Sequence, residues 1–149
     1  MVNKAFEEKV KKVTTFDASG NKNGFLIELF KDGDKTDVYL SATAPGAFKG
    51  YHLHRVRAAR YVCLKGKMKI ILYTPKKGKT KVEYKREEHI LDGNNPRRLF
   101  IPKNVATGLQ NIGDEDAWLV NYPDPPYDPG LKDEQVEYTQ EELEKGITK

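Results

Sequence analysis

The sequence predicts an all-β domain of the sandwich or small-barrel class, with one short helix near the C-terminus. Eight or more short segments with the pattern of β-strands follow one another at regular spacing, and turns that contain glycine or proline separate them. Only one segment carries a clear helix signature. At 149 residues the chain is expected to form a single domain over residues 1–149, which is long enough to bury a hydrophobic core.

The first predicted strands are the most informative. Residues 24–30 read G-F-L-I-E-L-F, a strong strand with one acid, Glu28, in an apolar setting. Residues 37–43 alternate, so Tyr39 and Ser41 share one face, which could line a polar pocket or meet solvent. The further extended segments are expected at residues 48–56, 59–64, 68–73, 80–86, 98–102, 105–112 and 116–122, with turns at 17–23, 32–34, 65–67 and 92–96.

The two ends of the chain differ from this pattern. Residues 1–13 are charged and are expected to form a short helical turn or an N-terminal arm that adds to another subunit. Residues 123–149 form a C-terminal tail. Its first part, P-D-P-P-Y-D-P-G, cannot be regular structure because proline removes backbone donors. The later segment 139–144, T-Q-E-E-L-E, begins with a helix-capping signature and predicts the one helix.

Composition limits the function classes. The net charge is +4, from 26 basic and 22 acidic residues, but the lysines are scattered among glutamates, which argues against nucleic-acid binding. No apolar run approaches the length needed to cross a membrane, so a cytoplasmic protein is expected. The single cysteine, Cys63, lies in an apolar run and is expected to be a buried, inert thiol in a reducing compartment.

Two histidines mark the candidate site. His52 and His54 are two residues apart in a predicted strand, so both imidazoles point to the same face. Lys49 precedes them and several arginines follow, which suggests a site that binds and processes a small anionic ligand. The alternative is a surface strand with two exposed histidines. An imidazole could remove a proton beside a ketone, a reaction that also needs an acid or a cation near the developing enolate, for which Lys49, Arg60 and a tyrosine are candidates by type.

The spacing G-x5-H-x-H over residues 46–54 resembles the first cupin motif. A second motif is present as I-P-K-N-V-A-T, but Thr107 stands where a metal-binding cupin has a histidine. Two of four metal ligands therefore remain, and a catalytic metal usually needs three protein ligands. We expect no catalytic metal and no cofactor, with a metal-dependent cupin as the less favoured alternative.

From about residue 23 to residue 138 the sequence resembles the sugar-nucleotide cupins typified by the dTDP-4-dehydrorhamnose 3,5-epimerases. The resemblance rests on N-G-F-L-I-E-L-F at 23–30, S-A-T-A-P at 41–45, K-G-Y-H-L-H at 49–54, I-P-K-N-V-A-T-G at 101–108 and P-Y-D-P at 126–129. It implies a cupin-type jelly roll, also called a double-stranded β-helix barrel, that forms a homodimer with exchanged N-terminal strands. It implies an isomerase or epimerase that acts on a nucleotide-linked 4-keto-6-deoxy sugar.

The resemblance also assigns roles to residues. His52 falls on the catalytic base, and Tyr127 falls on or next to the tyrosine that returns a proton from the opposite face. The pair H-x-H is similar to the dTDP-sugar 3,4-ketoisomerases, in which His54 would shuttle protons along one face. The implied substrate contacts are Lys49 to phosphate, Asn23 and Glu28 to the nucleotide, and Tyr39 and Ser41 on the substrate-facing strand.

Three departures leave an alternative open. The lysine expected near the enolate falls on Ala59, with Arg60 adjacent as a substitute cation. The segment expected to supply an aspartate that orients the base reads V-E-Y-T-Q at 136–140 and has no aspartate, and Thr107 replaces a phosphate-side histidine. The alternative is a non-catalytic cupin that binds a sugar nucleotide or a glycan.

Overall fold

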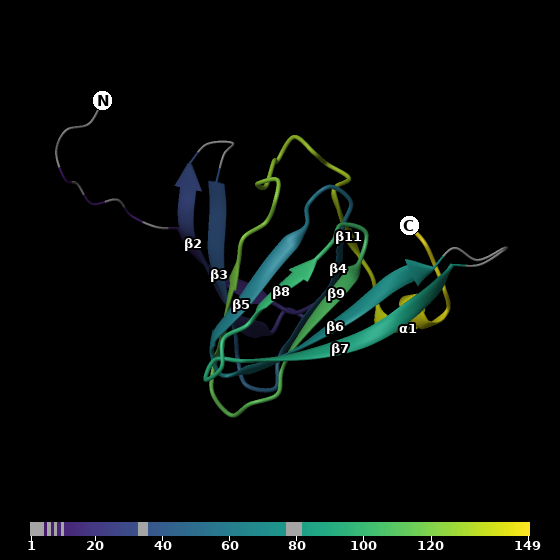
Figure 1. The fold of residues 1–149 in the computed structure, drawn as a ribbon, viewed down its shortest axis with the longest axis horizontal. Coiled ribbons are helices and arrows are strands. Elements are labelled where there is room, and N and C mark those ends of the chain that lie inside the picture. Colours follow the sequence, from purple (N-terminus) through teal and green to yellow (C-terminus); the bar gives the residue numbers. More distant parts are fainter. Residues whose placement is uncertain (1–4, 6, 8, 10, 33–35, 77–81) are drawn as a thin grey trace.

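The computed structural model describes all residues except 1–4, 6, 8, 10, 33–35 and 77–81. The described chain folds into two antiparallel sheets that face each other, so the predicted all-β jelly roll with one short C-terminal helix is confirmed (Figure 1). One sheet has six strands in the order β1-β2-β3-β10-β5-β8, and the other has five in the order β11-β4-β9-β6-β7. Neighbours in each sheet are often distant in the sequence, as in a jelly roll.

The strand bounds follow the predicted segments closely. In the six-stranded sheet the strands are β1 (Lys12–Phe16), β2 (Lys22–Asp32), β3 (Thr36–Thr43), β5 (Ala59–Lys65), β8 (Arg98–Ile101) and β10 (Ala117–Asn121). In the five-stranded sheet they are β4 (Phe48–His54), β6 (Lys67–Lys76), β7 (Glu83–Asp92), β9 (Ala106–Asn111) and β11 (Gln135–Glu137). Residues 33–34 of one predicted turn and residues 80–81 of one predicted strand lie outside the described residues.

Two strands were not expected. β1 includes the last residues of the predicted N-terminal arm and pairs with β2 of the same chain, while most of residues 1–10 lie outside the described residues. β11 has only three residues and pairs with β4. β7 also runs further than predicted, to Asp92, because it is an edge strand with one exposed face and tolerates many charges.

The core divides into two parts that leave room for a cavity. One cluster lies between the sheets and includes Cys63, which is fully buried as predicted, together with Met68 and Leu119. The second cluster lies on the outer side of the five-stranded sheet, where Tyr51 and Leu53 of β4 pack with Leu143. Strand alternation explains this arrangement, because outward-facing Tyr51 and Leu53 leave His52 and His54 facing the opposite sheet.

The helix α1 (Gln140–Glu144) covers that second cluster and lies beside β6 and β7 in Figure 1. Thr139 begins it with the predicted capping box, in which Thr139 and Glu142 each accept a hydrogen bond from the other's backbone N–H. Leu143 anchors the helix to the sheet. In the part of the chain that the structure describes, no helix is long and apolar enough to span a membrane.

The outer face of the six-stranded sheet carries several exposed apolar side chains as well as charged ones. Because β10 alternates, Leu119 and Asn121 face inward while Trp118 faces outward. Leu64 of β5 and Phe100 of β8 extend this outer face, and the three outward side chains are 37 to 54% exposed.

Candidate active site

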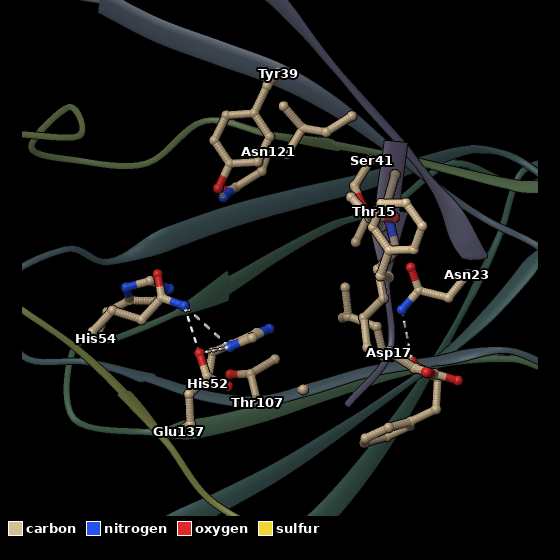
Figure 2. Close-up of a pocket in the computed structure, with 18 of the residues that line it drawn as sticks. Thr15, Asp17, Asn23, Tyr39, Ser41, His52, His54, Thr107, Asn121 and Glu137 are labelled. Atoms are coloured by element: carbon tan, nitrogen blue, oxygen red, sulfur yellow. Dashed lines mark hydrogen bonds and ion pairs between the residues drawn. The ribbon is translucent and has the colours of Figure 1, made fainter. Parts of the chain in front are cut away.

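A cavity of about 790 Å³ opens between the two sheets at the end that the hydrophobic core does not fill. This volume lies within the range of ordinary small-molecule sites. Its walls come from β1, the β1–β2 turn, β2, β3, β5 and β10 on one side and from β4, β9 and β11 on the other, with Arg57 between β4 and β5. Six of the nine predicted site residues line it, as Figure 2 shows in part: Asn23, Tyr39, Ser41, Lys49, His52 and His54.

The other three predicted site residues do not line the cavity. Glu28 pairs with Tyr39 in the sheet but lies beyond the cavity wall. Arg60 points to the outer face, because neighbouring strand residues alternate, and its guanidinium lies 5.2 Å from the centre of the Phe100 ring. Tyr127 is 53% exposed. Its ring stacks on the guanidinium of Arg57 at 5.3 Å, outside the cavity.

His52 forms a hydrogen-bonded pair with a glutamate. Strand β11 pairs with β4 so that Glu137 lies directly opposite His52. The distance from His52 Nδ1 to Glu137 Oε1 is 2.7 Å. Because a carboxylate accepts, this contact holds the imidazole proton on Nδ1 and leaves Nε2 as the basic nitrogen. Figure 2 shows one nitrogen of the His52 ring beside Glu137 and the other on the far side of the ring, toward the cavity.

Glu137 is kept ionised by its neighbours. Partial burial opposes its charge, but hydrogen bonds from His52 and Gln135 and the nearby imidazoles outweigh burial and lower the pKa of Glu137. Gln135 Nε2 donates to Glu137 Oε1 at 2.8 Å, which fixes the carboxylate beside the ring. The pair therefore has the arrangement of a general base and the acid that orients it.

His54 belongs to a second, more buried group. Its Nδ1 lies 3.1 Å from both carboxylate oxygens of Glu134 and 3.1 Å from Nη2 of Arg57. Burial and the positive charge of Arg57 lower the pKa of His54, against the opposing effect of Glu134. The imidazole of His54 is therefore neutral near pH 7 and can exchange protons with a ligand.

The facing wall is formed by β3 and β10. Tyr39 and Ser41 share the inward face of β3, as the alternation predicts, and Tyr39 Oη accepts a hydrogen bond from Asn121 Nδ2 at 2.8 Å. Lys49 reaches this wall from β4 and donates from Nζ to Ser41 Oγ and to Ala42 O, each at 2.9 Å. Burial lowers the pKa of Lys49 to about 8.

Sequence reasoning missed several residues of the site. The carboxylates Glu134 and Glu137 and the amides Gln135 and Asn121 all contact or line it. Arg57 lines it too, and the sequence indicated it only as one of the arginines that follow the histidines. One signal was present, because Glu137 lies in the segment where the resemblance expects an aspartate. Its side chain is one methylene longer, and the strand register places it against His52. Among the described residues, no three histidine, cysteine, aspartate or glutamate side chains come together as a metal site.

Fold and site together define a cupin-type jelly roll with paired imidazoles and carboxylates in its cavity. The chain belongs to the family described as the polysaccharide biosynthesis C-terminal domain, whose sequence profile matches residues 19–135. It is 27% identical over 130 residues to the probable low-salt glycan biosynthesis epimerase Agl13 of Haloferax volcanii, covering 83% of each chain. It is 28% identical over 137 residues to the spore coat polysaccharide biosynthesis protein SpsL of Bacillus subtilis, covering 85% of each chain.

Solved structures with low sequence identity share the fold. The capsular polysaccharide assembling protein CapF of Staphylococcus aureus superimposes with a TM-score of 0.69 at 20% identity, over 88% of this chain. The match spans only 32% of CapF, so the chain corresponds to about a third of that protein. A dTDP sugar isomerase of Desulfovibrio desulfuricans superimposes with a TM-score of 0.60 at 20% identity, over 89% of this chain and 82% of its own.

Proposed function

We propose that the protein is an isomerase or epimerase of a nucleotide-linked 4-keto-6-deoxy sugar, with dTDP as the expected nucleotide. The observation that carries the proposal is the pair of His52 and Glu137, joined at 2.7 Å, with the imidazole directed into the cavity. A family described by polysaccharide biosynthesis and a Haloferax relative named as a probable epimerase support a sugar as the substrate class.

The proposed reaction begins with proton removal beside the ketone. His52 Nε2 takes the proton, the electron pair of the C–H bond forms a double bond to the carbonyl carbon, and the carbonyl π electrons move to oxygen. Glu137 stabilises the imidazolium that forms, as the orienting acid of a catalytic histidine does. A positioned general base of this kind contributes roughly 10² to 10⁴ in rate.

The carbon that receives the proton, and the face from which it arrives, decide the product. In ketoisomerisation the C3 proton taken by His52 passes to His54 on the same strand, and His54 gives it to C4 on the same face. The C3 hydroxyl proton moves to the oxygen at C4, so the ketone moves from C4 to C3 and both imidazoles return to their resting state. Tyr39 stands on the opposite sheet and can return a proton from the other face, which inverts the carbon. Tyr127, the proton donor implied by the resemblance, does not line the cavity. His54 and Tyr39 are therefore the two candidate proton donors.

Deuterium exchange tests the proposal directly. The protein is incubated in D₂O with a dTDP-4-keto-6-deoxy sugar, and NMR follows the deuterium. Epimerisation places deuterium at C3 or C5 with the 4-ketone retained, whereas ketoisomerisation places it at C4 with a new ketone at C3. We expect His52→Ala to abolish the exchange. The matched control is His89→Ala, because His89 also pairs with a glutamate, Glu87 at 3.2 Å, but on β7 and outside the cavity wall.

The alternatives give different results in the same assay. If His52→Ala retained deuterium exchange into the sugar, His52 would be ruled out as the base. Tight binding of dTDP by the wild-type protein without exchange into any 4-keto sugar would favour the non-catalytic binding module. Elemental analysis of the purified protein addresses the metal-dependent alternative.

We also propose that a second copy of the chain is the partner, packed through the outer face of the six-stranded sheet. Homodimer interfaces are more apolar than ordinary surface, and the outward side chains of Trp118, Leu64 and Phe100 fit that composition. Light scattering after size exclusion should report a dimer that Trp118→Glu dissociates. Ile90→Lys is the control, because Ile90 is also an exposed apolar residue, at 57% against 37% for Trp118, but lies on β7 of the other sheet. A monomeric wild-type protein would contradict this assignment.

A further inference from the structure

We propose that Arg57 binds the carbonyl oxygen of the substrate and stabilises the negative charge that forms there. This inference rests on the proposed function, since it assigns a residue to the enolate step of that reaction. Removal of a proton beside a ketone leaves charge on oxygen, and preorganised donors at that oxygen usually make the largest contribution to catalysis. The cavity must therefore present a cation or donors where the oxygen lies.

Neither Ala59, the position of the lysine that the resemblance expects, nor its neighbour Arg60 supplies a cation to the cavity. Ala59 is buried in the apolar cluster between the sheets. Arg60 lies on the outer face, where it packs on Phe100 and forms an ion pair with Asp124 at 3.7 Å. Among the described residues, the lysines and arginines that line the cavity are Lys49 and Arg57. Lys49 already donates to Ser41 Oγ and Ala42 O.

Arg57 is held rigidly at the same end of the cavity as His54. It is only 8% exposed, and its Nε lies 3.2 Å from Glu134 Oε1 in an ion pair. Nη2 lies 3.1 Å from His54 Nδ1, and the Tyr127 ring covers the guanidinium at 5.3 Å. A guanidinium fixed on several sides needs little reorganisation when charge develops beside it.

One nitrogen of this guanidinium remains available to a ligand. Nη1 makes no hydrogen bond with any described residue and is not fully enclosed by protein atoms, so it can donate to a ligand. Nε, by contrast, is enclosed, and its contact with Glu134 is an ion pair without hydrogen-bond geometry. The positive charge of Arg57 also acts on two tyrosines that line the cavity. Burial raises the pKa of Tyr39 and of Tyr61, and Arg57 opposes that rise in both, so its field reaches the phenols that line the cavity.

With Arg57 in this role, the proposed reaction needs no further reactant. His52 Nε2 receives the proton, the C–H electron pair forms the carbon–carbon double bond, and the oxygen that gains the electron pair accepts hydrogen bonds from Arg57. Return of the proton to carbon restores a ketone and frees the guanidinium. Glu134 balances the charge of Arg57 in the resting site, so the buried cation is tolerated before substrate binds.

The test compares Arg57→Lys, Arg57→Ala and the control Arg55→Gln. Arg55 is two residues away and contacts backbone carbonyls of the tail, Asp133 O and Lys149 O, but does not line the cavity. Deuterium exchange and steady-state kinetics are measured together with dTDP affinity by calorimetry, and circular dichroism checks folding. Guanidinium ion is then added to Arg57→Ala at millimolar concentration.

We expect Arg57→Ala to lower kcat roughly 10² to 10³-fold, the usual loss when one oxyanion donor is removed, with dTDP affinity unchanged. Added guanidinium should restore part of the exchange, ammonium should not, and Arg57→Lys should keep an intermediate rate. Wild-type kcat in Arg57→Ala would overturn the assignment. So would a folded variant that loses dTDP affinity in parallel with kcat and shows no rescue. A wild-type protein without exchange would instead refute the proposed function itself.

Discussion

Glu134→Gln should destabilise the fold more than any change of a surface charge. Glu134 and Arg57 are 7% and 8% exposed, and the glutamate also accepts from the backbone N–H of Arg57 at 3.2 Å. Glutamine keeps the shape and one acceptor oxygen but removes the charge that balances the guanidinium. Breaking a buried ion pair from one side costs about 3 to 5 kcal/mol, because the remaining charge stays buried without compensation.

Urea unfolding followed by circular dichroism measures this loss. With a slope of about 2 kcal/mol per molar urea, a loss of about 3 kcal/mol lowers the unfolding midpoint by about 1.5 M. The double variant Glu134→Gln with Arg57→Met removes both charges, and we expect it to be more stable than Glu134→Gln alone. Glu141→Gln breaks the exposed pair with Lys145 and should cost less than about 0.5 kcal/mol. Additive losses in the double variant would refute the reasoning.

Three further predictions concern single positions. Because burial lowers the pKa of Lys49 to about 8, the folded protein binds fewer protons than the unfolded chain between pH 8 and 10.5. The free energy of unfolding of the wild type should therefore rise relative to that of Lys49→Met over that window. Urea titrations at pH 7, 9 and 10 measure both, and a difference between them that does not change with pH would contradict this. Gly24→Ala should prevent folding, since φ is +149° and a Cβ would collide with the backbone at Ala42 O. At Gly20 φ is +84° but a Cβ meets nothing within 4 Å, so Gly20→Ala should cost only about 1 kcal/mol and still yield folded protein by circular dichroism. Thr139→Ala removes the helix cap and should cost about 1 kcal/mol in the same urea assay, and no change would argue that the capping box contributes nothing.

The strands and the inward faces could be predicted because they depend on local patterns. Alternation along β3 and β4 placed Tyr39, Ser41, His52 and His54 correctly relative to their own strands. Capping residues at Thr139 likewise identified the helix from a few neighbouring side chains. Local patterns of this kind can be recognised in the sequence without knowledge of the rest of the fold.

The carboxylates could not be predicted because their positions depend on long-range pairing. β11 has three residues, too few for a periodic signal, and it exists because it pairs with β4 some eighty residues earlier in the chain. Tyr127 also has a position that the sequence could not predict. Its motif fits the resemblance, but its backbone N–H donates to Asp37 and its ring stacks on Arg57, so the proline-rich segment leads it away from the cavity.

The carboxylates of both histidine pairs come from the same short stretch of chain. Glu134 and Glu137 are three residues apart, and they serve His54 and His52 respectively. Loss of the pairing between β11 and β4 would therefore separate both carboxylates from their imidazoles in one event. Order in this part of the tail and the surroundings of both histidines are thus coupled.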